Sequence, residues 1–101
     1  MEERRSGVRR RTLRSAKIVY GDYRYTVDCI IRDASTTGLR IRCDHAAEIP
    51  GEFQLYDPAE NSLQKVEVMW RRDNELGLKY VSPPIHIHES NDPRHARFKF
   101  M

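Results

Sequence analysis

The stretch Asp33-Ala34-Ser35-Thr36-Thr37-Gly38 lies between two segments, residues 23–32 and 39–43, in which alternating apolar residues predict β-strands. Aspartate and serine carry short polar side chains that can bond the local backbone or face outward. Glycine allows a backbone conformation or a close approach that a Cβ atom would block. The spacing D-x-S-x-x-G therefore predicts a turn whose polar groups can also serve a ligand.

Further strands are predicted on both sides of this turn. Short alternating or apolar segments bounded by turn residues cover residues 16–20, 23–32, 39–43, 53–55, 66–70 and 76–80. No segment between residues 16 and 81 has the sustained i, i+3, i+4, i+7 spacing of an amphipathic helix. Six strands in a chain of 101 residues favour an all-β fold, a six-stranded antiparallel barrel, because closure removes exposed sheet edges.

The alternation also assigns side chains to the core. Cys29 and Cys43 fall on inward faces and lack metal-ligand spacing, so we expect both to be buried and reduced. Trp70 falls on the inward face of its strand with Val66 and Val68. For this tryptophan, core packing is favoured over stacking on a ligand.

The two ends of the chain differ from its centre. Residues 1–15 are predicted to be a flexible Arg-rich arm, residues 16–82 the barrel, and residues 83–101 a C-terminal extension. In the extension, Asp92 could cap and Pro93 could begin a short helix that ends at Phe100.

Positive charge is concentrated at the amino-terminal end. The first fourteen residues hold six arginines and two glutamates, whereas the rest of the chain holds twelve basic and thirteen acidic residues. A broad nucleic-acid-binding face would spread this charge more widely, so nucleic acid is not the expected partner. A small β-barrel that binds nucleic acid through the basic arm remains the alternative. No run approaches the roughly 20 apolar residues of a membrane span, and no secretory signal is present, so we expect a cytoplasmic location without membrane association.

The arginine-rich segment Arg9-Arg10-Arg11-Thr12-Leu13-Arg14 reads R-R-x-x-x-R and precedes D-x-S-x-x-G by one short strand and a hairpin. In this order the two motifs resemble those of the PilZ domain family, and the resemblance extends from Arg9 to Val81. It implies a six-stranded barrel that is a receptor for the bacterial second messenger cyclic di-GMP. It also implies an unidentified effector protein, in motility or exopolysaccharide regulation.

The resemblance further implies which residues bind the ligand. Arginine suits a cyclic dinucleotide because its planar guanidinium pairs with phosphate or with the guanine Hoogsteen edge and stacks on bases. Asp33 could accept from guanine N1 and N2, Ser35 could bond a phosphate or base edge, and Gly38 would let the backbone approach. The implied ligand-binding residues are Arg9, Arg10, Arg14, Asp33, Ser35 and Gly38, with Arg5, Arg40 and Arg42 as additional candidates.

Two points stay open among the arginines. Arg5 and Arg9 also satisfy R-x-x-x-R, but Arg10 and Arg14 are preferred because the second arginine should lie just before the first strand. Arg9 precedes the preferred motif and could stack on or pair with a second ligand, so two cyclic di-GMP molecules per chain are expected. Arg40 and Arg42 lie on an outer strand face, where simple solvation is the alternative.

Catalysis and metal binding find little support. The sequence lacks a recognisable nucleophile–base pair, a Gly-rich phosphate loop and paired carboxylates, so we expect no enzyme activity, no catalytic residue and no cofactor besides the ligand. His86 and His88 could share one face of an extended segment, but they lack a clear cysteine or carboxylate partner at ligand spacing, and no metal site is expected.

Overall fold

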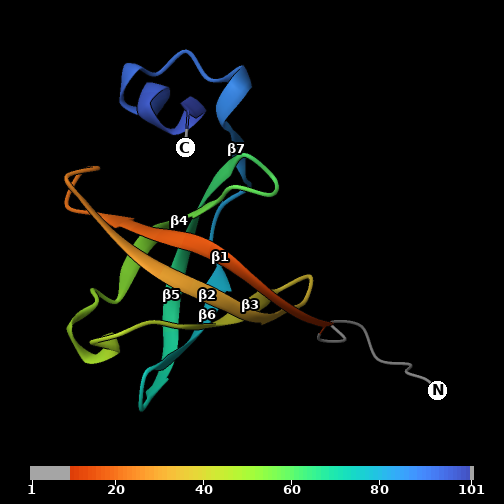
Figure 1. The fold of residues 1–101 in the computed structure, drawn as a ribbon, viewed down its shortest axis with the longest axis vertical. Coiled ribbons are helices and arrows are strands. Elements are labelled where there is room, and N and C mark those ends of the chain that lie inside the picture. Colours follow the sequence, from red (N-terminus) through yellow and green to blue (C-terminus); the bar gives the residue numbers. More distant parts are fainter. Residues whose placement is uncertain (1–9, 101) are drawn as a thin grey trace.

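A computed structural model of the protein describes the backbone of residues 10–100 and the side chains of residues 13–99. The chain forms a strongly twisted β-barrel with the C-terminal extension packed outside it (Figure 1). The strands are β1 (Arg10–Tyr20), β2 (Tyr25–Ala34), β3 (Gly38–Arg42), β4 (Glu52–Asp57), β5 (Ser62–Arg72), β6 (Glu75–Tyr80) and β7 (Ile85–His86). Three 3-10 helices, η1 (Ala46–Glu48), η2 (Ile87–Glu89) and η3 (Pro93–Phe100), complete the described elements.

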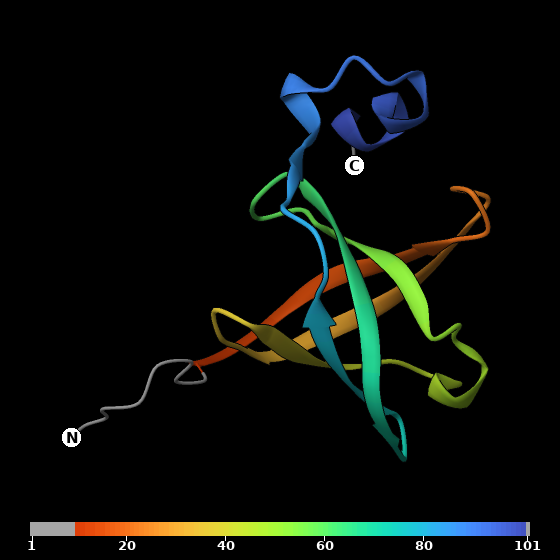
Figure 2. The ribbon, with the colours of Figure 1, turned by 180° about the vertical axis from the view of Figure 1, so that it is seen from behind.

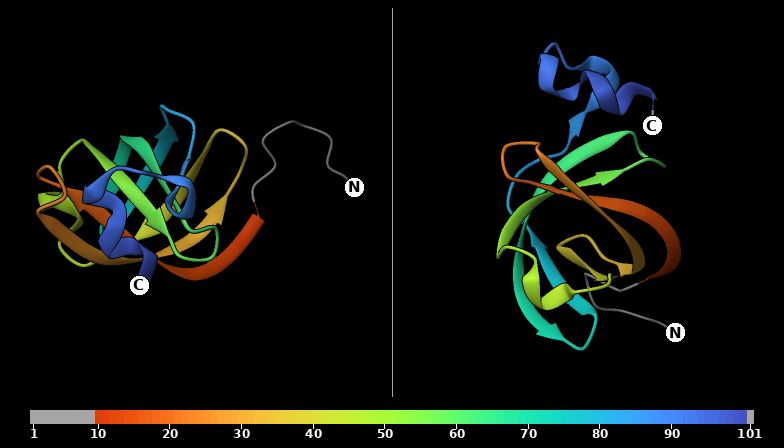
Figure 3. Two further views of the ribbon diagram at one scale, coloured as in Figure 1. Left: turned by 90° about the horizontal axis from the view of Figure 1, so that it is seen from above. Right: turned by 60° about the vertical axis from the view of Figure 1, so that its left-hand side comes forward.

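The barrel closes through antiparallel pairing alone. The pairs β1–β2, β2–β3, β3–β6, β6–β5, β5–β4 and β4–β1 return the sheet to its first strand, and the short β7 adds to β5. The oblique view in Figure 3 shows this closure, and Figure 2 shows the barrel from behind. The predicted all-β, six-stranded antiparallel barrel is confirmed, with β7 as an extra strand. None of the described helices is long and apolar enough to cross a membrane.

The barrel interior is filled by the alternating apolar residues that the sequence places inward. Cys29 and Cys43 are both buried in this cluster and both are free thiols, as expected. Burial raises the pKa of the Cys29 thiol to about 12, because a thiolate would lose its hydration there. The other buried members are Ala16, Ile18, Ile31, Leu39, Ile41, Ala46, Ile49, Phe53, Leu55, Val66, Leu76 and Leu78.

The first strand begins earlier than its sequence pattern indicates. It starts at Arg10 rather than Ala16, so residues 10–15 belong to β1 instead of the expected arm, while residues 1–9 lie outside the described part of the chain. A β-bulge explains the difference: residues 12 and 13 together face Arg32 of β2, and Leu13 has a left-handed φ of 45°. The bulge interrupts the alternation that identifies a strand.

A second bulge moves Trp70 out of the core. The pairing of β5 with β6 shifts between Val68 and Trp70, and the Trp70 side chain is 41% exposed. The expectation that Trp70 packs inside the barrel is therefore wrong. Its indole instead lies against Gly77 of the neighbouring strand, where an added Cβ atom would be 2.0 Å from the indole Nε1.

The C-terminal extension packs against the outer wall of the barrel. Phe98 of η3 joins a second apolar cluster with Val19 of β1 and Tyr56 of β4, which alternate with core residues of the same strands. The Tyr56 and Phe98 rings are 4.9 Å apart, and the Tyr56 hydroxyl donates to the Phe98 carbonyl oxygen at 3.1 Å. The right-hand view in Figure 3 shows the extension, in blue, beyond one end of the barrel.

The expected short helix from Pro93 to Phe100 is confirmed, as a 3-10 helix. Asp92 acts as its cap, because Asp92 Oδ1 accepts from the Arg94 backbone N–H at 2.9 Å. Hydrogen bonds from the Arg94 side chain and backbone lower the pKa of the Asp92 carboxyl to about 2.

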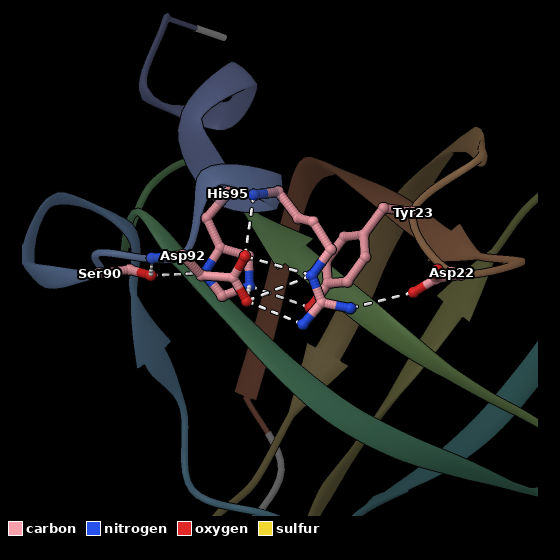
Figure 4. A network of polar contacts seen from close by, with 6 residues as sticks. Asp22, Tyr23, Ser90, Asp92 and His95 are labelled. Atoms are coloured by element: carbon pink, nitrogen blue, oxygen red, sulfur yellow. Dashed lines mark hydrogen bonds and ion pairs between the residues drawn. The ribbon is translucent and has the colours of Figure 1, made fainter.

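Polar contacts tie this helix to the β1–β2 hairpin (Figure 4). The buried His95 side chain lies 2.9 Å from the Tyr23 hydroxyl through Nε2 and 2.6 Å from Ser90 Oγ through Nδ1. Arg94 bonds Asp22 at 3.0 Å and lies over the Tyr23 ring. The extension is therefore fixed at the end of the β1–β2 ribbon opposite to the D-x-S-x-x-G turn, as Figures 1 and 2 both show.

Candidate functional site

The D-x-S-x-x-G stretch is shared between two strands and a tight turn. Asp33 and Ala34 end β2, and Gly38 begins β3, so the strands extend further into the motif than the sequence suggests. Ser35 closes the turn: its backbone N–H donates to the Gly38 carbonyl at 2.8 Å, and its Oγ accepts from the Thr37 N–H at 3.3 Å. The serine hydroxyl thus shapes the turn that would meet a ligand.

Gly38 is required by close packing of the backbone. A Cβ atom at this position would lie 2.1 Å from the Leu78 carbonyl oxygen of β6. The φ angle of Gly38 is not positive, so glycine is needed here for the close approach of the β6 backbone and not for a left-handed conformation. The Tyr80 N–H donates to the Thr37 carbonyl at 3.1 Å, which holds the turn against β6.

Asp33 is held by an arginine of the neighbouring strand. The residue is 6% exposed, and its Oδ2 accepts from Arg40 Nε at 3.0 Å and lies 2.8 Å from Arg40 Nη2. Glu75 of β6 pairs with Arg40 at 3.4 Å and with Arg32 at 3.5 Å. Arg40 is therefore not simply solvated, because its guanidinium holds the motif carboxylate.

Backbone register aligns the motif with an aromatic side chain three strands away. Arg11 of β1 pairs with Asp33, Asp33 with Arg40, Arg40 with Gly77, and Gly77 with Trp70. We call these five residues the cross-strand row. The row places a carboxylate, a guanidinium and an exposed indole side by side on the outer wall. The Trp70 end, together with Thr37 and Gly38, lines a shallow cavity of about 240 Å3.

Arg14 does not meet Asp33. Its guanidinium binds Asp57 at the end of β4, with Nη2 2.6 Å from Oδ2 and Nε 3.3 Å from Oδ1. This hydrogen-bonded carboxylate raises the pKa of Arg14 above its ordinary value. Arg14 and Ala34 of the motif nevertheless line one cavity of about 240 Å3 at the barrel mouth, together with Tyr80. The arginine is thus near the motif turn but bound to another partner.

The remaining candidate arginines are distributed differently. Arg10 pairs with Ala34 in the backbone ladder, which places it beside the motif turn. Arg42 lies exposed two residues beyond Arg40 and opposite Glu75 in the register. Arg5 and Arg9 fall outside the described residues, so their candidate roles remain expectations from the sequence.

Sequence reasoning missed two residues that matter to this geometry. Trp70 was assigned to the core, although a glycine inside a neighbouring strand, Gly77, is a signal for close approach of another group. Asp57 has no predicted role in the sequence analysis. Its link to Arg14 spans 43 positions, and no local pattern indicates it.

Comparison with known proteins agrees with this architecture. A family model described as PilZ domain matches residues 3–91 of the chain. A search of curated proteins finds no match. The matched region contains both motifs and all seven strands. The chain therefore belongs to the PilZ domain family, and this membership implies a module that binds cyclic di-GMP.

Proposed function

We propose that this chain is a non-catalytic receptor that binds cyclic di-GMP on the outer wall of the barrel, beside the Ser35–Thr37 turn. The cross-strand row is the observation that carries this proposal. It sets a buried, oriented carboxylate and an exposed aromatic side chain in one row across neighbouring strands, and the carboxylate residue Asp33 pairs with the strand that begins with Arg10. A guanine needs such a pair, because it offers N–H donors at its edge and a π-face for stacking.

Asp33 is proposed to recognise a guanine edge. A carboxylate accepts the N1–H and N2–H donors that distinguish guanine from adenine. Arg40 supports this role because two of its N–H groups hold Asp33 Oδ2, and Glu75 in turn holds Arg40. Arg40 is thus a positioning residue, while Ser35 and Gly38 keep the turn tight enough for the ligand to reach the strand.

Trp70 is proposed to stack on a guanine base. Its indole is exposed and its support is a glycine, so one face is held while the other remains available to solvent. Stacking of a base on an aromatic side chain contributes about 1–3 kcal/mol. The cavity beside Trp70 also includes Thr37 and Gly38, so a stacked base would touch the motif turn.

Arg10 and Arg14 are proposed to bind the phosphates, and Arg9 a second ligand. The arm of residues 1–9 would then close over the nucleotide, since phosphate charge offsets repulsion among its arginines. The closed arm would form a new surface, and we propose that an effector protein binds it.

Isothermal titration with cyclic di-GMP tests the proposal. The chain should bind at micromolar concentration or tighter, and the titration should end at two ligands per chain. Arg10→Ala should weaken binding about tenfold to a hundredfold, because a charged hydrogen bond contributes about 1.5–3 kcal/mol. Arg24→Ala is the matched control, since Arg24 is exposed in the β1–β2 hairpin, at the far end of the ribbon from the motif turn.

The aromatic contact is tested in the same way. Trp70→Ala should weaken binding about tenfold, whereas Tyr25→Ala should not, because Tyr25 is an exposed aromatic residue remote from the motif. Cyclic di-AMP and GTP should bind much more weakly than cyclic di-GMP. Equal binding of these nucleotides, or steeply salt-dependent binding of RNA in their place, would favour the basic-arm alternative and reject the receptor. An endpoint of one ligand would reject the second site alone.

A further inference from the structure

Arg14 already holds an anion in this structure, and that anion belongs to the protein. The guanidinium uses Nε and Nη2 to bind both carboxylate oxygens of Asp57, at 3.3 and 2.6 Å. Two parallel N–H···O bonds along one edge of a guanidinium are also the geometry with which arginine binds phosphate. A phosphate taken by this edge of Arg14 must therefore replace Asp57.

The surroundings of Arg14 are unfavourable for an additional anion. Asp57 is only 9% exposed, so its charge is poorly screened by solvent. Its Oδ1 also accepts from the Ala59 N–H at 3.0 Å, which keeps the carboxylate in place when Arg14 leaves. Glu60 contributes a second negative charge close enough to act on Arg14. Two carboxylates thus oppose one guanidinium at the barrel mouth.

We propose that Asp57 is an affinity-setting residue, an intramolecular carboxylate that occupies the phosphate-binding edge of Arg14 until cyclic di-GMP displaces it. The inference rests on the proposed function, because it concerns the same ligand and the same arginine. Only molecules in which Arg14 has left Asp57 bind with full strength. The apparent dissociation constant is therefore the intrinsic one divided by the fraction of ligand-free molecules in which Arg14 is released, so a smaller fraction means weaker binding.

A different role for Asp57 would have the opposite effect. If Asp57 oriented Arg14 toward the ligand, removal of the carboxylate would weaken binding, as for other positioning residues. The sign of the change in affinity therefore separates competition from orientation.

The test is the substitution Asp57→Asn in the full chain, titrated with cyclic di-GMP. Asparagine keeps an Oδ1 that can accept from the Ala59 N–H, and it removes the charge that holds Arg14. The dissociation constant should fall about three- to tenfold relative to the unsubstituted chain. The thermal midpoint should fall at the same time, because the ligand-free protein loses an ion pair.

Asp28→Asn is the matched control. Asp28 of β2 forms an ion pair of 2.6 Å with Lys17, which lies on β1 as Arg14 does. This variant therefore makes the same charge change and also removes an ion pair to β1. Its affinity should stay within about twofold of the unsubstituted chain. A tightening equal to that of Asp57→Asn would mean that net charge alone is responsible, and it would overturn the inference. Unchanged or weaker binding by Asp57→Asn would overturn it too.

A second pair of variants keeps the test decisive. In an Arg14→Ala background, Asp57→Asn should have no effect on affinity, because the competition requires both residues. If Asp57→Asn does not fold, Asp57→Ser serves instead: its hydroxyl can still accept from the Ala59 N–H, it carries no charge to hold Arg14, and it should tighten binding by a similar factor. Failure of every variant and of the unsubstituted chain to bind rejects the proposed function and this inference together. Binding that Asp57→Asn does not tighten rejects the inference alone.

Discussion

Single residues in this protein are constrained by contacts that their local sequence does not show. Gly38 must lack a side chain because the Leu78 carbonyl oxygen of a strand forty positions away occupies the space. Ser35 is a turn residue first, since its hydroxyl accepts from Thr37 within the turn. The motif therefore combines residues that build the surface with one, Asp33, that we propose binds the ligand.

Replacing Gly38 by alanine should lower the free energy of unfolding by about 2–4 kcal/mol, because β3 and β6 must separate to admit the Cβ atom. Urea unfolding followed by circular dichroism measures this change. Gly51→Ala is the control, since an added Cβ atom there meets nothing within 4 Å. Its stability should change by less than about 0.5 kcal/mol. Equal effects of the two substitutions would contradict the close-contact explanation.

At the residue scale, the sequence predicted the turn and its polar groups but not their partners. Spacing alone indicates that Asp33, Ser35 and Gly38 share a turn. It does not indicate that Arg40 holds Asp33 or that Asp57 holds Arg14, because ion pairs between strands depend on register and on barrel closure. Long-range pairs of this kind need the structure.

Among the elements, the two errors of the sequence analysis have one physical cause. A bulge in β1 interrupts the alternation of apolar residues, so the sequence pattern misses the first six residues of this strand. Another bulge turns Trp70 of β5 outward. One extra residue in a strand exchanges the inward and outward faces beyond it, so strict alternation assigns those side chains to the wrong side. Strands β3, β4 and β6 keep their apolar alternation, and their core residues were predicted correctly. In β2 the alternation correctly predicts Cys29 and Ile31, which precede the shift in β2–β3 pairing between Ile31 and Asp33.

The C-terminal extension is an element that depends on one side chain. Phe98 is fully buried between the extension and Tyr56, whereas its neighbour Lys99 is exposed. We expect Phe98→Ala to lower the free energy of unfolding by about 3 kcal/mol, and Lys99→Ala to change it little. Hydrogen exchange should show lost protection around His95 in the first variant only. Retained protection would mean that the polar contacts in Figure 4 suffice to hold the extension.

For the molecule as a whole, the titration of one buried thiol links stability to pH. The pKa of Cys29 is raised to about 12 from an ordinary value of 9.0. The unfolded chain therefore releases this proton at a lower pH than the folded one. The stabilisation is fully present below about pH 9 and is lost as pH rises toward 12.

Urea unfolding at pH 8.5 and 10.5 tests this linkage. Between these values the unsubstituted chain should lose about 1–2 kcal/mol more than Cys29→Ala, because alanine at position 29 has no thiol to ionise on unfolding. Titrations of Cys43, lysine and tyrosine are common to both proteins and cancel in the comparison. Parallel pH dependence of the two proteins would show that the Cys29 environment is more hydrated than its burial indicates.

The neighbours in the cross-strand row are set by the backbone register, and so by the number of residues in each strand. A member other than Gly77 can be replaced while the backbone ladder keeps its neighbours adjacent. Inserting or deleting a single residue in β3 or β6, by contrast, would carry Arg40 or the glycine support of Trp70 to the opposite side of the sheet. We therefore expect this surface to vary by substitution, while the number of residues in β3 and β6 stays fixed.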